Sequence, residues 1–400
     1  MRILYIASYQ GPDIVVRRRM IRNRSLGGSR KIELISNMLH RQGHDVTILS
    51  SGIPAERSGR FYRAFESTTT GIPGKGVRVL YAGGLDVRFL NYAFAILSSI
   101  KWIKHEYSKK PFDMLLAYNI DEFTWPVTWF YLRCIDMIPI MLEYEDSVDV
   151  TGRGHNVLRS MIWHSMEKWL STRLRGVISV NSVIAARLKN PNTYIMRGVV
   201  SEKFCQTVSF RKPPLSGSPP YIATFCGSLM PDKGVNLIPE IAEKFKGRIT
   251  FVIAGTGPLQ NALKMAAQNS RGDVEFVGQL TNQDLNKLLG SSDILINPHE
   301  DEPSGGILPF KLVEYLTAGG IVVTTTTGNQ RDDLFNYCEI TRPNAYDLTE
   351  TLEYILAHPD DMAERARQGQ LWAISNYSEN IISQELERLI FFAKSPLSGS

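Results

Sequence analysis

Residues 221–234 read YIATFCGSLMPDKG: an apolar, β-rich run leads directly into a glycine turn, a lysine and a second glycine. Residues 248–259, RITFVIAGTGPL, repeat the apolar run and the glycine turn. Such turns between strand and helix bring backbone amides close to a ligand, and Lys233 adds a positive charge beside them. The pattern predicts a phosphate site. A plain loop with an exposed lysine explains Lys233 equally well, and tight-turn geometry is the stronger explanation of Gly255 and Gly257.

Strand-like and helix-like patterns alternate along the whole chain. The expected strands read RILYIAS, HDVTILSS, VRVLYAG, FDMLLAY, IPIMLEYE, GVISVNS and TYIMRG in the first half, and YIATFCGS, RITFVIAGTG, VEFVG, DILINP and GIVVTTT in the second. Helical periodicity is expected over 29–41, 235–245, 259–268, 282–289 and 310–318. This alternation predicts an α/β protein with two doubly wound parallel sheets, each covered by helices on both faces.

The length of 400 residues is too great for one hydrophobic core and fits two domains. The segment 209–220, SFRKPPLSGSPP, is rich in proline, serine and glycine and is the best candidate for the boundary region. We predict domains over 1–205 and 206–375. Residues 376–400 are predicted to form a helix that packs back on the first domain, followed by a disordered tail.

A third element, NPHEDEPSGGILPFKLVEYLTAGG, spans residues 297–320. It passes from a strand end through an acidic, glycine-bearing loop into a helix that carries Glu314. Backbone amides of the loop could point at an anion, namely those of Ser304, Gly305, Gly306 and Ile307. Glu314 could accept hydrogen bonds from sugar hydroxyls. An ordinary amphipathic helix accounts for the apolar residues around Glu314, but it does not account for the loop before it.

Taken in order, GSLMPDKG, IAGTGPL, VEFVGQL, SSDILINP, the glycine-rich loop and KLVEYLTAGG resemble a family-4-like retaining glycosyltransferase of the GT-B fold. In the first half, SLGGSRKIELISNMLHRQGHDVTILSSG, GVISVNSVIAARL and IMRGVVSEKF are similar to segments of that family, so the resemblance covers nearly the whole chain. It implies two Rossmann-like domains facing an interdomain cleft, with a nucleotide-sugar on the second domain and an acceptor on the first.

The resemblance also implies roles for individual residues. Lys233 would hold the diphosphate, Glu314 would bind the ribose, and either Glu302 or no residue would be the first glutamate of the donor motif. Lys233, Glu314 and Glu302 are the predicted catalytic residues. The full predicted donor set is Gly227, Ser228, Lys233, Gly255, Gly257, Leu280, Ser304, Gly305, Gly306, Ile307 and Glu314. Ser228 stands where the family often has arginine, so one positive charge of the diphosphate site is missing there.

In the first domain, the resemblance implies that Gly27 and Gly28 approach the diphosphate or the transferred sugar. The strand end LEYEDSVD places Glu145 and Asp146 at the same edge, where we expect them to bind sugar hydroxyls. A general-base role is the alternative, but the front-face mechanism that the resemblance implies uses the leaving diphosphate as the base.

Charge is divided unequally along the chain. Residues 1–200 hold 28 basic and 16 acidic residues (+12), whereas residues 201–400 hold 17 and 24 (−7). A run of basic residues within 17–31 indicates binding to an anionic acceptor or membrane surface rather than a merely solvated loop. The predicted contact residues are Arg17, Arg18, Arg19, Arg22, Arg24 and Arg30. The candidates are a phosphorylated acceptor, an acidic glycan and an anionic bilayer. No nucleic-acid recognition module accompanies the charge.

The apolar stretch 87–110 could be a helix resting on a membrane, although a buried crossover helix is the more common case. No transmembrane helix, signal peptide or zinc motif is expected, and four scattered cysteines predict reduced thiols in the cytoplasm. A peripheral position on the inner membrane face is the alternative location.

The sequence therefore predicts transfer of a hexose or related sugar from a UDP- or GDP-sugar to a glycan or lipid-linked acceptor, with retention and without metal or cofactor. Cell-surface polysaccharide or glycoconjugate synthesis is the expected setting. A nucleotide-sugar epimerase of similar architecture and a catalytically silent glycosyltransferase-like subunit are the alternatives.

Overall fold

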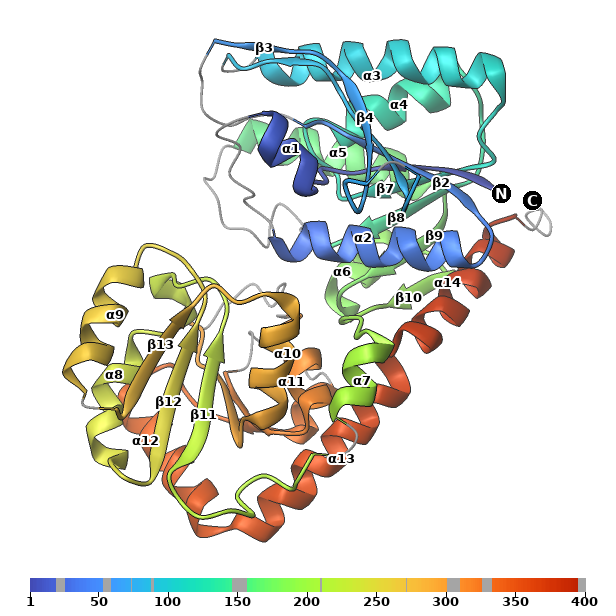
Figure 1. Ribbon diagram of the computed structural model, residues 1–400. Helices are drawn as coiled ribbons and strands as arrows, with labels where there is room; N and C mark the ends of the chain where they lie inside the picture. Colours follow the sequence, from blue (N-terminus) through green and yellow to red (C-terminus); the bar gives the residue numbers. More distant parts are fainter. Residues whose placement is uncertain are drawn as a thin grey trace. The chain divides into compact units, whose positions relative to one another are not determined.

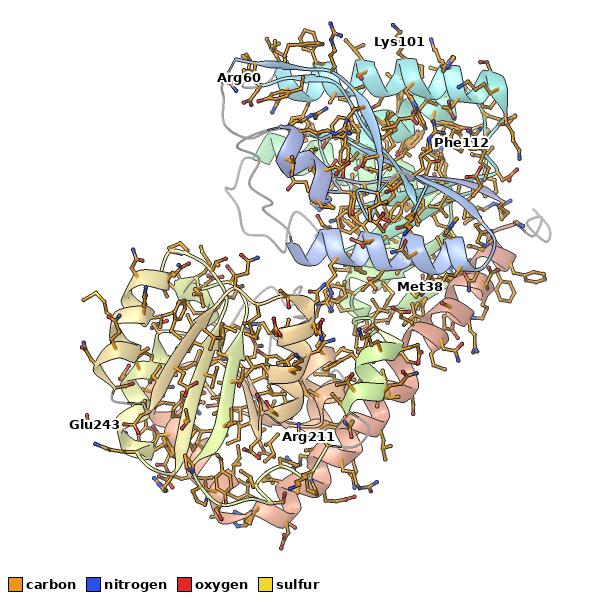
Figure 2. All side chains as sticks on the ribbon, in the orientation of Figure 1. Met38, Arg60, Lys101, Phe112, Arg211 and Glu243 are labelled. Carbon is orange, nitrogen blue, oxygen red and sulfur yellow. The ribbon has the colours of Figure 1, made fainter. Side chains whose placement is uncertain are left out.

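The computed structural model describes residues 1–18, 26–52, 59–72, 74–87, 90–145, 157–208, 211–270, 272–300, 310–325 and 333–394. The chain divides into two compact units (Figure 1). Unit 1 comprises 1–196 and 382–400, and unit 2 comprises 197–381. Side chains crowd between sheet and helices in each unit, whereas Lys101 and Glu243 project into solvent (Figure 2).

Unit 1 is built on an eight-stranded sheet in the order β10-β9-β8-β7-β1-β2-β5-β4. All pairs in it are parallel except β4 with β5. Its strands are β1 (Arg2–Ile6), β2 (Asp45–Ser50), β4 (Phe65–Thr68), β5 (Arg78–Tyr81), β7 (Met114–Tyr118), β8 (Ile140–Tyr144), β9 (Leu174–Ser179) and β10 (Thr193–Ile195). Strands β3 (Phe61–Tyr62) and β6 (Gly84–Leu85) form a separate antiparallel pair. The central strands β1, β7 and β8 are buried throughout, as expected for a parallel sheet with both faces covered.

The helices of unit 1 in the described residues are α1 (Pro12–Arg17), α2 (Leu26–Arg41), α3 (Leu90–Lys109), α4 (Thr124–Cys134), α5 (Val157–Ser171) and α6 (Ser182–Leu188). They are joined by α14 (Glu379–Lys394), whose residues from Ile382 onward belong to this unit. Leu386 and Ile390 of α14 line a small apolar space with Ile3 and Met114 of the sheet. The C-terminal helix thus returns to the first unit.

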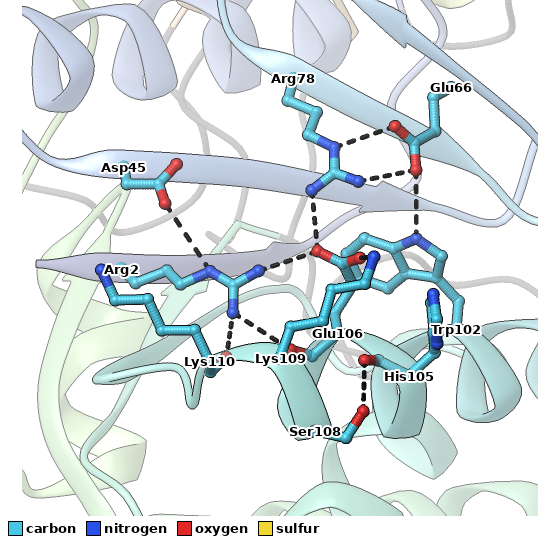
Figure 3. A network of polar contacts seen from close by, with 10 residues as sticks. All are labelled: Arg2, Asp45, Glu66, Arg78, Trp102, His105, Glu106, Ser108, Lys109 and Lys110. Carbon is cyan, nitrogen blue, oxygen red and sulfur yellow. Dashed lines mark hydrogen bonds and ion pairs between the residues drawn. The ribbon is translucent and has the colours of Figure 1, made fainter.

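A polar network fixes the amino ends of the unit 1 strands (Figure 3). Glu106, 3% exposed at the end of α3, accepts hydrogen bonds from Arg2 (2.8 Å), Arg78 (2.9 Å) and Lys109 (2.8 Å). Arg78 also pairs with Glu66 at 2.7 Å. Three cations around one buried carboxylate join α3 to β1 and β5, because an unpaired charge there would be costly.

Unit 2 holds a parallel six-stranded sheet in the order β13-β12-β11-β14-β15-β16. Its strands are β11 (Tyr221–Cys226), β12 (Ile249–Ala254), β13 (Val274–Gly278), β14 (Ile294–Asn297), β15 (Ile321–Thr324) and β16 (Cys338–Ile340). The described helices are α7 (Glu202–Val208), η1 (Pro231–Lys233), α8 (Leu237–Ala242), η2 (Glu243–Phe245), α9 (Gln260–Asn269), α10 (Asn282–Ser291), α11 (Lys311–Ala318), η3 (Asp333–Tyr337), α12 (Ala345–Ala357) and α13 (Pro359–Tyr377). This strand order is that of a Rossmann fold.

The change from unit 1 to unit 2 comes earlier than the proline-rich segment. The boundary falls between Met196 and Arg197, whereas the sequence predicted it after residue 205. The chain re-enters unit 1 at Ile382, whereas the sequence predicted the end of the second domain at residue 375. In the expected boundary segment, Arg211 donates to the carbonyls of Ala318 (2.7 Å) and Ser292 (2.9 Å). This segment therefore belongs to unit 2, since long-range hydrogen bonds fix it there.

Among the described helices, none combines the length and apolar character that crossing a membrane requires. Within the same residues, no group of three or more histidine, cysteine, aspartate or glutamate side chains is arranged to hold a metal ion.

Candidate functional site

The strand order of unit 2 reverses direction at β11, which has β12 on one side and β14 on the other. Ligands of such sheets bind beyond the carboxyl ends of the strands, next to the point of reversal. The chain leaves β11 through Gly227 and Ser228, and it leaves β14 through Pro298 toward α11. The predicted donor residues Gly227, Ser228 and Lys233 therefore lie where the chain leaves β11 at this position.

The glycine turns at this edge touch backbone to backbone. A Cβ on Gly255 would lie 1.8 Å from the carbonyl oxygen of Gly227, and one on Gly257 would lie 2.6 Å from that of Leu229. A Cβ on Gly234 would lie 1.9 Å from the carbonyl oxygen of Pro298. Side chains are excluded at all three positions, so the glycines have a second role besides permitting turns: they let three loops converge.

Lys233 ends the short η1 helix after β11, and Gly234 follows it with a φ of 67°. Its Nζ lies 2.9 Å from Asp232 Oδ2, and both side chains are well exposed, at 39% and 51%. An exposed pair of this kind contributes little stability. Lys233 is therefore accessible to an anionic ligand, and its role at a phosphate site stays a prediction.

Glu314 lies half-buried in the first turn of α11. The helix is fixed to β11 by Tyr315, whose hydroxyl accepts from the Cys226 amide at 2.9 Å and donates to the Cys226 carbonyl at 3.2 Å. Lys311, one turn before Tyr315 on the same helix face, extends over the Phe225 ring. Lys311 is not among the predicted donor residues; the available signal was a lysine directly before the apolar face of the helix.

The remaining donor residues fall in three groups. Ser228 is exposed, and Leu280 is half-buried where the chain passes from β13 to α10. Gly227 has a φ of 152°. The predicted residues Glu302, Ser304, Gly305, Gly306 and Ile307 lie outside the described residues, so the choice between Glu302 and no residue as the first glutamate stays open.

In unit 1, Gly27 and Gly28 lie in the first turn of α2, which begins at Leu26 rather than at the expected residue 29. A Cβ on Gly27 would meet no atom within 4 Å. Both glycines are helical, and their approach to the diphosphate or the transferred sugar stays a prediction. Gly27 remains exposed at the amino end of a 16-residue helix.

Glu145, predicted from the strand end, belongs to a buried polar network. Lys31 of α2 pairs with Glu145 and, at 2.9 Å, with Glu143 of β8. Tyr118 donates to Glu145, and Tyr5 donates to Glu143. Burial raises the pKa of Glu143, while the neighbouring Lys31 opposes that rise. In the sequence, Lys31 follows Arg30 at the end of the basic run that was expected to meet an anionic partner, and its long-range carboxylate partners could not be seen there.

The Glu145 backbone N–H also donates to the Asn119 side chain at 2.7 Å. Asn119 adopts a positive φ of 57° just after β7. Glu145 is thus held at the carboxyl edge of the sheet with its side chain 11% exposed. Asp146 lies outside the described residues.

The basic run divides into different environments. Arg18 is 2% exposed and donates to the carbonyls of Gly52, Ala82 (2.7 Å) and Arg63 (3.1 Å). It therefore has a structural role in this conformation, and we remove it from the predicted acceptor or membrane surface. Arg17 is exposed beside the Phe65 ring, and Arg30 is half-buried. Arg19, Arg22 and Arg24 lie outside the described residues.

Comparison with known proteins agrees with this architecture. The chain has a TM-score of 0.69 with sucrose-phosphate synthase from Thermosynechococcus elongatus, at 15% identity, covering 98% of this chain and 100% of that one. It has a TM-score of 0.63 with HepE from Anabaena in complex with UDP-glucose, at 13% identity, covering 98% and 99%. The chain has the GT-B fold. The predicted pair of Rossmann-like units is confirmed.

The family-model match lies within unit 2. Residues 220–358 match the family model described as Glycosyl transferases group 1. A segment of 112 residues is 28% identical to glycogen synthase from Elusimicrobium minutum (strain Pei191), and it represents 28% of this chain. The match spans 22% of that synthase's length. The group 1 match contains both glycine turns, Lys233 and Glu314, so the predicted resemblance is confirmed for this segment.

Proposed function

We propose that this protein is a retaining glycosyltransferase that moves a sugar from a nucleotide-diphosphate sugar to a glycan or lipid-linked acceptor. One observation carries the proposal: at the β11 reversal of unit 2, three glycine-lined loops converge beside Lys233 and the helix that bears Glu314. The group 1 match over 220–358 and the shared fold with a UDP-glucose complex support it.

The chemistry follows from these groups. Lys233 and the backbone amides of the glycine turns would stabilise the negative charge that develops on the departing diphosphate. The Glu314 carboxylate would accept hydrogen bonds from the ribose hydroxyls. The leaving diphosphate would take the proton of the acceptor hydroxyl, and Glu145 would bind a sugar hydroxyl without serving as a base. A UDP- or GDP-sugar is the proposed donor, and no metal or cofactor has a role.

The outer face of α3 supports a lipid-linked acceptor. Leu90, Phe94 and Leu97 are 47%, 40% and 64% exposed, and they share this face with the exposed Lys101 and Lys104. The opposite face packs into unit 1 through Ala95, Ser99, Ile103 and Glu106. An apolar stripe flanked by lysines suits an anionic bilayer surface. We therefore propose that the protein acts in cell-surface glycan synthesis, bound peripherally to the cytoplasmic membrane face.

Donor binding is the first test. Because a ligand of the folded state raises apparent stability, a thermal-shift screen across UDP-, GDP-, ADP- and TDP-sugars identifies the nucleotide. Lys233→Ala and Glu314→Ala are expected to reduce that shift, and Lys264→Ala on the exposed face of α9 is the matched control. The proposal is overturned if no nucleotide-sugar shifts the wild-type protein, which would favour a silent subunit.

Product analysis is the second test. With the identified donor and a lipid-linked or glycan acceptor, the NMR spectrum of the product reports the anomeric configuration, which we expect to be retained. Incubation with donor alone separates transfer from epimerisation, since an epimerase converts the donor without an acceptor. Full transfer activity in both the Lys233 and the Glu314 variant would contradict the assigned site.

A further inference from the structure

A buried ammonium group lies beside the first glycine turn of unit 2. The Nζ atom of Lys311 has under 1 Å² of accessible surface and no hydrogen-bond partner within the described structure. It lies 4.5 Å from the centroid of the Phe225 ring, and a Cβ on Gly227 would lie only 3.0 Å from it. The charge is therefore directed at the backbone that leaves β11.

The position of Lys311 is held by its own helix. Lys311 begins α11, and Tyr315 lies one turn later on the same face. The Tyr315 hydroxyl is hydrogen-bonded to both backbone groups of Cys226, at 2.9 and 3.2 Å. Because residues four apart on a helix are neighbours, this contact brings the Lys311 side chain to the end of β11.

The charged groups around Lys311 do not neutralise it completely. Burial is the main cause that lowers its pKa, to about 8; Lys233 acts in the same direction, and Cys226, Glu314 and Asp232 oppose the shift without cancelling it. A cation buried without a hydrogen-bonded anion is unfavourable in the free protein. An anion arriving at the glycine turn would relieve that cost, so the site is prepared for a negative ligand.

We infer that Lys311 is a second cation for the donor diphosphate, placed beside the Gly227 turn and acting in addition to Lys233. The inference rests on the proposed function and deepens it. Ser228 offers only a hydroxyl at this turn, and Lys311 supplies the missing positive charge from a helix that is 83 residues further along the chain. The ligand chemistry that it recognises is a nucleoside diphosphate, through the phosphates and not through the base.

Two consequences follow. Binding of a dianion raises the pKa of Lys311, so the protein takes up protons on binding at pH values above about 8. The affinity for the diphosphate then falls as the pH rises above that value, because the free lysine loses its proton. Replacing Lys311 by an uncharged residue should not lower the stability of the free protein, because it removes an unpaired buried ammonium.

Isothermal titration of UDP, GDP and their nucleosides into wild type, Lys311→Met, Lys311→Arg and the exposed control Lys264→Met tests the inference. We expect Lys311→Met to bind the preferred diphosphate at least tenfold more weakly, with nucleoside affinity and apo melting temperature undiminished. Titrations at pH 8.5 in two buffers of different ionisation enthalpy measure the number of protons that the protein takes up on binding. Wild type should take up protons, whereas Lys311→Met and Lys311→Arg should take up fewer, because neither side chain titrates near that pH.

The outcomes separate the two claims. If wild type binds a nucleoside diphosphate and Lys311→Met binds it equally well, the inference fails while the proposed function stands. If Lys311→Met melts lower and loses nucleoside and diphosphate binding alike, Lys311 has a structural role and the inference also fails. If wild type binds no nucleoside diphosphate, the proposed function and the inference fall together.

Discussion

Lys31 Nζ lies 2.9 Å from Glu143 Oε1, and neither side chain is more than 3% exposed. Glu145 pairs with the same lysine. Burial disfavours the charge on Lys31, yet the two carboxylates outweigh it and raise the Lys31 pKa above its ordinary value. One ammonium thus holds α2 against the strand end that carries Glu145.

Replacing Lys31 by methionine should destabilise unit 1 strongly. The substitution leaves two neighbouring carboxylates without their cation, and breaking a buried pair in this way costs about 3–5 kcal/mol. Urea unfolding measures the change, and Lys75→Met, at an exposed lysine of the same unit, is the control. Equal stability of the two variants would show that the network contributes nothing.

The free energy of unfolding should also fall at low pH through Glu106. Burial disfavours its charged form, but hydrogen bonds from Lys109 and Arg78 outweigh burial and lower its pKa to about 2 from the ordinary 4.5. A lowered carboxylate pKa stabilises the fold above pH 4.5, and that contribution is lost as pH falls from 4.5 to 2. The contribution of the lowered Glu106 pKa to the free energy of unfolding is about 3 kcal/mol.

Glu106→Gln should remove this part of the pH dependence. Urea midpoints at pH 5 and pH 3 measure it, and Glu275→Gln, on an exposed position of β13, provides the comparison. A variant whose midpoint falls between these pH values as much as that of wild type would refute the assignment to Glu106.

Arg18 and Arg17 should respond differently to the same change. Arg18→Lys removes the planar guanidinium that reaches three backbone carbonyls, and one or two of them lose their partner at about 1–3 kcal/mol each. Arg17→Lys alters an exposed side chain and should change stability by less than about 0.5 kcal/mol. Melting temperatures of the two variants decide the question, and equal values would return Arg18 to the candidate binding surface.

Gly257→Ala should damage the donor site by steric contact alone. Its Cβ would lie 2.6 Å from the Leu229 carbonyl oxygen, so the turns after β11 and β12 must separate. We expect at least tenfold weaker nucleotide binding. Gly217→Ala, where a Cβ meets no atom within 4 Å, is the matched control and should bind normally. Normal binding by Gly257→Ala would mean that these turns do not shape the site.

The apolar stripe on α3 gives a membrane prediction. Leu97→Glu places a negative charge among Leu90, Phe94 and Lys101 and should reduce flotation with anionic phosphatidylglycerol vesicles at least fivefold. Leu371→Glu introduces the same change at a 52% exposed leucine of α13 and should leave flotation unchanged. Comparable flotation of both variants and wild type would remove α3 as the contact face.

Local sequence patterns predicted much of unit 2 correctly. The apolar runs ending at Gly227 and Gly255 form adjacent parallel strands, and 310–318 is expected where α11 spans Lys311–Ala318. These features depend on the few residues in one strand, turn or helix. Lys233 and Glu314 could be selected in the same way, because each directly follows a recognisable turn or loop. The tight approach of Gly234 to Pro298 could not, since it joins loops 64 residues apart.

By itself, the sequence determined most of the parallel strands, the two-unit fold and the loops that form the candidate site, but it did not predict the short strands β3, β4, β6 and β16. Only the tertiary structure decided which charges are buried. Arg17 and Arg18 are neighbours in one basic run, yet Arg18 alone reaches the Ala82 carbonyl, 64 residues away. In the sequence, Lys311 cannot be distinguished from a surface lysine; in the folded chain its Nζ packs against the Phe225 ring. Whether a charged side chain is buried depends on how distant segments pack together. Because desolvating a charge is costly, that packing decides the role of the side chain.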